Sequence, residues 1–195
     1  MTKRAVLATY RDFLDRMTDE ILDVVGEKAG DGLAGRVVRK SAAAVTGSLE
    51  EQMRDQGRVL VEYTDARVRG NEDLSTYRET FLDTNPVYVR YDGDEAEMLE
   101  SELLDHFARA ASDLEPLVGT ETDDFWLALT EEYTREEAED IIERHFNQAE
   151  TFTEYRDGIF GSQRVGNLVI DVVEEGERRF RKQLFEELDR VYGEN

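Results

Sequence analysis

The sequence has no cysteine, only two histidines and two prolines, and four lysines beside twenty arginines. Without cysteine, a disulfide framework, a thiolate metal site and a cysteine nucleophile are all excluded. No apolar run approaches the roughly 20 residues that a membrane-spanning helix needs. The start, MTKRAVLATYRDF, reaches charged side chains too soon for a signal peptide. We therefore expect a soluble, cytoplasmic protein without a membrane partner.

Acidic residues are in large excess. The 195 residues include 46 acidic and 24 basic side chains, which gives a net charge of -22. Residues 1–69 carry 12 of each sign, whereas residues 70–195 carry 12 basic and 34 acidic groups. This composition, with little lysine and no cysteine, resembles that of soluble proteins from salt-in halophiles, in which dispersed acid serves solvation in molar salt. The alternative is an acidic mesophilic interaction protein.

Apolar residues follow a helical period over most of the chain, and 39% of the residues are hydrophobic, enough to bury a core. The first segment has a 3-4-3-4-3 spacing typical of one helix stripe, formed by Leu7, Tyr10, Leu14, Met17, Ile21 and Val24. Further helices are predicted from about 33 to 49, then over 94–112, 123–132, 135–156 and 163–192, with a capping box at Thr134 and Glu137. The prediction is an all-α bundle of about six or seven helices in one domain, 1–195.

Two short segments leave a second interpretation open. The segment 57–63 contains RVLVEY, and the segment 87–91 reads VYVRY after Asn85 and Pro86. Each has the β-branched and aromatic residues of a strand, and together they would form one short hairpin insert. Short apolar runs do not separate strand from helix, so a helix at 57–63 remains the alternative.

The stretch GDGLAG, residues 30–35, has the spacing G-x-G-x-x-G of a dinucleotide-binding turn. That turn needs a strand before the glycines and a helix after them. Here a helical stripe comes before, and Asp31 would place a carboxylate where a pyrophosphate should bind. We therefore interpret the motif as a turn between two helices and expect no nucleotide cofactor.

The histidines give little support for a metal site. His106 and His145 lie in similar segments, LLDHFARA and IIERHFNQA, but the residues three before them are Leu103 and Ile142. The Glu-x-x-His pairing of di-iron bundles is therefore absent. We expect partly buried or surface histidines and no metal.

Two basic clusters differ in their local partners. In EEGERRFRK, residues 174–182, glutamates precede the arginines at helical spacing and neutralise them. In RVVRK, residues 36–40, the basic residues Arg36, Arg39 and Lys40 have no acid three or four positions away. These three residues are the predicted partner-binding face. The alternative is a contact with the chain's own acidic helices.

These observations favour a helical protein that acts through protein–protein interaction or self-association. A second interpretation is a nucleic-acid-associated regulator that uses the basic residues of 36–69, although molar salt weakens phosphate contacts. A third is an enzyme with a site of carboxylate, tyrosine and arginine. No catalytic residue, cofactor site or metal ligand is identified from the sequence.

Overall fold

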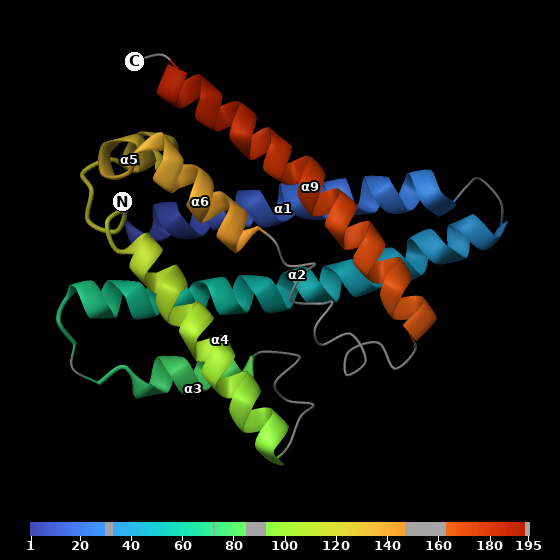
Figure 1. The fold of residues 1–195 in the computed structure, drawn as a ribbon, viewed down its shortest axis with the longest axis horizontal. Coiled ribbons are helices and arrows are strands. Elements are labelled where there is room, and N and C mark those ends of the chain that lie inside the picture. Colours follow the sequence, from blue (N-terminus) through green and yellow to red (C-terminus); the bar gives the residue numbers. More distant parts are fainter. Residues whose placement is uncertain (30–32, 72, 85–92, 147–162, 194–195) are drawn as a thin grey trace.

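The computed structural model describes residues 1–29, 33–71, 73–84, 93–146 and 163–193 (Figure 1). These residues form seven helices and contain no strand, which confirms the all-α prediction. No helix in these ranges is long and apolar enough to cross a bilayer. The helices are α1 (Lys3–Ala29), α2 (Leu33–Val68), α3 (Ser75–Asp83), α4 (Gly93–Leu114), α5 (Phe125–Glu132), α6 (Arg135–His145) and α9 (Gln163–Gly193).

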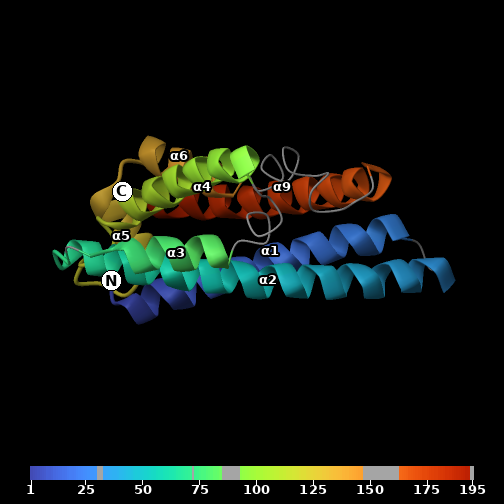
Figure 2. The same ribbon diagram turned by 90° about the horizontal axis from the view of Figure 1, so that it is seen from below.

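The helices pack in two layers (Figure 2). The long helices α1 and α2 lie antiparallel and, with α3, form one layer. Helices α4, α6 and α9 lie across them in the second layer, and α5 lies near the N-terminus at one end (Figures 1 and 2). This arrangement places α9 over α1, and α4 over α2 and α3.

The predicted stripe of α1 is the centre of the core. Leu14, Met17 and Ile21 are buried, as is Val24, while the first two members of the stripe are only partly buried. They pack with the apolar face of α9 in the larger of two core clusters. The α9 face is formed by residues with no exposed surface, Phe180, Leu184 and Leu188.

Two glycines allow close approach of neighbouring elements. A Cβ on Gly176 of α9 would lie 2.8 Å from the Ile21 Cα of α1, so this crossing requires glycine. A Cβ on Gly57 of α2 would lie 2.1 Å from the ring of Tyr10. Because Tyr10 donates a hydrogen bond to the Met53 carbonyl oxygen, 3.0 Å away, its ring is held against α2.

The segment 57–63, for which the sequence leaves strand and helix open, is part of helix α2 and contributes to the second core cluster. Val59 and Tyr63 lie one helical turn apart and pack with Phe81 of α3 and Phe107 of α4. Burial against two other helices thus overrides the strand preference of this β-branched segment. The segment 87–91 lies outside the described residues.

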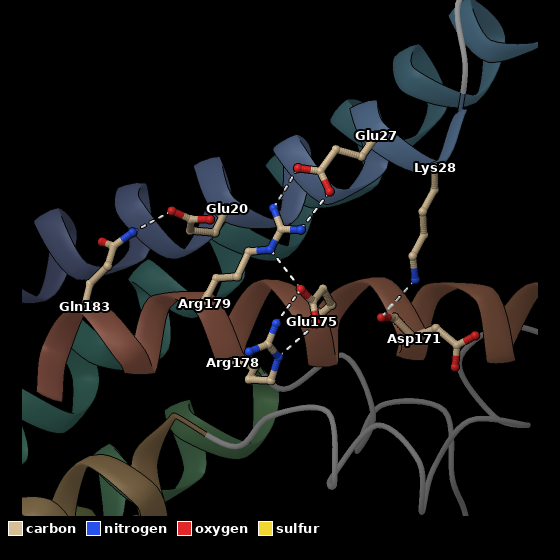
Figure 3. Close-up of polar contacts among 8 residues, drawn as sticks. All are labelled: Glu20, Glu27, Lys28, Asp171, Glu175, Arg178, Arg179 and Gln183. Atoms are coloured by element: carbon tan, nitrogen blue, oxygen red, sulfur yellow. Dashed lines mark hydrogen bonds and ion pairs between the residues drawn. The ribbon is translucent and has the colours of Figure 1, made fainter.

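Polar side chains connect α1 with α9 along their exposed edge (Figure 3). Arg179 bridges Glu27 of α1, at 2.7 Å, and Glu175 of its own helix, at 2.9 Å. Arg178 also binds Glu175, at 2.7 Å, so this one carboxylate is shared by two arginines of the cluster. The spacing predicts the pair with Arg179, four positions later. Hydrogen bonds from Arg178 and Arg179 lower the pKa of Glu175 to about 2.

The described part of the glycine motif, residues 33–35, belongs to the start of α2. Helix α1 ends at Ala29 and α2 begins at Leu33, whereas residues 30–32 lie outside the described residues. The strand that a dinucleotide-binding turn requires before its glycines is therefore replaced by a helix.

The capping box at the start of α6 is confirmed. The Thr134 hydroxyl accepts from the Glu137 N–H, and the Glu137 carboxylate accepts from the Thr134 N–H at 2.9 Å. This helix ends at His145, with Phe146 as its C-cap, so the prediction of one helix over 135–156 is wrong at Phe146; residues 147–156 lie outside the described ranges. The sequence does not predict helix α3.

Candidate functional site

The basic face predicted to bind a partner lies in the first turns of α2, beside the end of α1 (Figure 1). Arg36 and Lys40 are exposed, and neither has an ion pair with a described residue. The side chain of Arg39 lies outside the described part of the structure. Arg36 and Lys40 therefore do not dock on the described acidic helices of the same chain.

The arginines from 54 to 69, three in α2 and Arg69 just after it, are paired with carboxylates. Arg54 binds Asp15 and Glu50, and the three after it form the pairs Arg58–Asp55, Arg67–Glu115 and Arg69–Asp65, with N–O distances of 3.2, 2.6 and 3.0 Å. Arg36 and Lys40 thus differ from these four later arginines and share with Arg4 and Arg11 of α1 the lack of an ion pair within the described residues.

A cavity of about 520 Å³ lies between the two layers, and the sequence does not predict it. Residues of α1 to α6 line it, and its wall joins the two core clusters. Most of this wall is apolar. Its aromatic members are Tyr10, Phe13, Phe81, Phe107, Phe125, Trp126 and Phe146.

Several aromatic side chains of the wall are held in place by packing against one another. The Phe13 ring lies 5.3 Å from that of Phe125 and 5.8 Å from that of Phe146, both edge-to-face. On the opposite side, Phe81 and Phe107 stack at 4.4 Å. Because these rings pack against one another and Tyr10 is held by its hydrogen bond to the Met53 carbonyl oxygen, the aromatic part of the wall is preorganised.

Histidine and carboxylate side chains meet on one side of the cavity. The His145 Nε2 and the Arg144 Nη1 each lie 2.6 Å from the same Asp113 oxygen, Oδ2. A carboxylate accepts only, so His145 donates its Nε2 proton to Asp113. Although burial alone would raise it, the hydrogen bonds from His145 and Arg144 hold the pKa of Asp113 below its ordinary value.

His106 of α4 faces His145 of α6, with ring centroids 5.9 Å apart. Burial, and then the electrostatic effects of His145, Arg109 and Arg144, lower the pKa of His106, against the opposing effect of Asp113. The neutral ring is therefore favoured, and it offers one donor and one acceptor to the cavity.

Arg109 completes this polar side. It lines the cavity next to His106 and remains exposed to solvent. Its only hydrogen bond within the described residues is from Nε to the Asp105 carbonyl oxygen at 3.3 Å, and it has no ion pair with a described carboxylate.

The sequence contains one signal for this site. The segments around His106 and His145 are similar, but their spacing does not tell that α4 and α6 face each other. His106 and Asp113 are seven residues apart, two turns along one face of α4. In the described part of the chain, no group of three His, Cys, Asp or Glu side chains is arranged to hold a metal ion.

Comparison with known proteins adds no name to this arrangement. No protein-family model matches the chain, and no curated protein or solved structure shows significant similarity to it. The function must therefore be inferred from the chemistry of the cavity and of the exposed basic face.

Proposed function

We propose that this protein binds a small, largely apolar molecule in the cavity between its two helical layers. The observation that carries the proposal is the cavity of about 520 Å³, whose wall is mostly apolar, with seven aromatic side chains, and polar on one side. Ligand sites in proteins have this volume and this combination of apolar surface with a few convergent polar groups.

The energetics of the wall support an apolar occupant. Removing core volume costs about 24 cal/mol per Å³ of closed cavity, so a sealed space of this size would cost on the order of 10 kcal/mol. That is comparable with the whole stability of a domain. The opening at the polar side reduces this cost, but the apolar part of the wall still gains free energy when a solute covers it.

The proposal is tested with an uncharged fluorescent probe, N-phenylnaphthylamine. We expect saturable binding by the wild type and loss of binding in Ala110→Phe, because Ala110 is a buried residue of the wall and the added ring fills the cavity. The matched control is Ser112→Phe, which places the same ring on the exposed side of the same helix. Circular dichroism of both variants checks that they fold.

Equal binding by Ala110→Phe and the wild type would place the probe outside the cavity and remove the support for this function. If Ala110→Phe does not fold, Leu103→Trp is used instead, because Leu103 also lines the cavity and is only partly buried.

The second candidate function is interaction with an acidic protein surface through Arg36 and Lys40, with Arg39. Its support is the exposure of Arg36 and Lys40 and their lack of carboxylate partners among described residues. Bidentate arginine contacts would hold such a partner even where salt screens long-range attraction. We do not extend this proposal to nucleic acid, because the described arginines from 54 to 69 are bound to carboxylates.

This candidate is tested by changing Arg36, Arg39 and Lys40 together to Gln. Light scattering and capture of partners should show that an association of the wild type is lost while the melting temperature is unchanged. The control changes Arg4, Arg11 and Arg58 to Gln, which removes the same charge from other exposed positions. Lower stability with unchanged association would show that the face serves folding only.

A further inference from the structure

The polar side of the cavity distinguishes between classes of ligand. One face of α4 presents His106, Arg109 and Asp113 to the cavity, at intervals of three and four residues. Because the ligand head group must lie against this face, the charges that remain uncompensated there decide its chemistry.

The negative charges at this face are already bound. Asp113 accepts from His145 and Arg144, both at 2.6 Å, so its carboxylate is compensated by a cation and a hydrogen-bond donor. Glu102 also lines the cavity, but it is exposed to solvent and takes part in an interaction of its own. A cationic ligand would therefore compete with existing partners for either carboxylate.

The positive charge of Arg109 is not compensated in this way. Its guanidinium has no ion pair with a described residue, and only its Nε is used, by the Asp105 carbonyl oxygen. The two terminal nitrogens keep the planar fork that binds a carboxylate through two parallel hydrogen bonds. Because Arg109 is exposed, a carboxylate bound to it remains partly hydrated, which lowers the cost of its desolvation.

Resting on the binding function proposed above, we propose that the ligand is a monocarboxylate with an aromatic or alkyl body. The body lies against the aromatic wall, and the carboxylate is bound by Arg109 and by the ring of His106. An anion beside His106 favours its protonated form. The other charged or titratable groups that face His106 are Arg109, Asp113, Arg144 and His145. Binding of the carboxylate is therefore accompanied by uptake of a proton.

The test compares naphthoate with naphthamide, which have the same shape and differ in charge. Each displaces N-phenylnaphthylamine at a salt concentration at which the chain is folded. We expect naphthoate to bind about two- to fivefold more tightly, the range for an ion pair that stays exposed to solvent. Proton uptake is measured separately, by calorimetry of naphthoate binding in buffers with different ionisation enthalpies.

Arg109→Gln is expected to remove the preference for naphthoate and to leave binding of naphthamide unchanged. Arg11→Gln is the matched control, because Arg11 is exposed, does not line the cavity and has no ion pair with a described residue. Arg109→Lys should restore only part of the preference, since an ammonium group lacks the planar fork.

The outcomes separate this inference from the function on which it rests. Equal affinity for both compounds, abolished by Ala110→Phe, would keep the binding function and overturn the carboxylate assignment. A preference that persists in Arg109→Gln would also overturn that assignment. If neither compound nor the probe binds, the proposed function itself fails.

Discussion

At the scale of single residues, the absence of a side chain at Gly176 decides how closely α1 and α9 pack. A Cβ on Gly176 would lie 2.5 Å from the Ile21 Cγ1 and 2.9 Å from the Ile21 backbone nitrogen. A flexible side chain can move away from such a contact, but helix backbone cannot do so without separating the two helices.

Gly176→Ala is therefore expected to destabilise the fold by about 1–3 kcal/mol, in spite of the better helix propensity of alanine. The matched control is Gly26→Ala in α1, where an added Cβ has no atom within 4 Å. This control should stabilise the protein by about 0.5–1 kcal/mol. Urea unfolding of both variants measures the difference, and a stabilising Gly176→Ala would contradict the described crossing of α1 and α9.

His106 gives the stability of the protein a dependence on pH. Its pKa in the folded protein lies below the ordinary value of 6.5. Above about pH 6.5 the His106 ring is neutral in both the folded and the unfolded state, so its contribution to the free energy of unfolding is fully present. As the pH falls below this value, the unfolded chain binds the proton first, so stability is lost.

We expect urea unfolding to show a smaller free energy at about pH 5.5 than at about pH 7.5, and His106→Gln to reduce this difference. The comparison isolates His106, because every other titratable group is the same in both proteins. An equal loss of stability in His106→Gln and the wild type would show that another group causes the pH dependence.

At the scale of helices, local signals and tertiary packing contribute separately. Helix α6 depends on its capping box, since 7 of its 11 residues are charged. Thr134→Ala removes one acceptor for the first turn and should cost about 0.5–2 kcal/mol. The control is Thr80→Ala in α3, whose hydroxyl donates only to the Thr76 carbonyl oxygen one turn earlier. Thermal unfolding that is equal for the two variants would contradict the role of the cap.

The sequence predicts those features that depend on neighbours along the chain. The stripe of Leu14, Met17 and Ile21 and the pair of Glu175 with Arg179 follow from helical spacing, and both are observed. Arg178 instead binds Glu175, three positions before it. The sequence does not decide between helix and strand at 57–63, because burial of this segment depends on Phe81 and Phe107 of later helices.

The cavity could not be predicted for the same reason. His106 and His145 lie in similar segments, but the approach of their rings depends on how α4 and α6 cross. Asp113 is one of 46 acidic residues, and only the structure shows that it binds His145 and Arg144. The basic face of Arg36, Arg39 and Lys40 remains a prediction about partners that the fold does not test.

At the scale of the whole molecule, the net charge of -22 acts against the compact state. Surface ion pairs such as Arg179–Glu27 oppose this effect only in part, since exposed pairs contribute little each. Salt weakens both the repulsion and the ion pairs, but the excess of acid makes the repulsion the stronger of the two. The halophilic interpretation follows from this balance and stays a prediction.

We expect the melting temperature and the helical circular dichroism to rise as KCl is increased to molar concentration, where the screening length falls to about 3 Å. Sucrose serves as the control, because it favours burial through exclusion from the surface without screening charge. Equal thermal stability in dilute buffer and in molar KCl would contradict the halophilic interpretation.

The central claim, that a small molecule binds in the cavity, is tested most directly by Trp126. It is the only tryptophan of the chain, and it lies half-buried in the cavity wall. Titration with N-phenylnaphthylamine should quench Trp126 emission by energy transfer, with saturation at one probe per chain, and Ala110→Phe should abolish the quenching while Ser112→Phe retains it. Probe fluorescence that saturates without any change in Trp126 emission, or quenching that survives in Ala110→Phe, would contradict the claim.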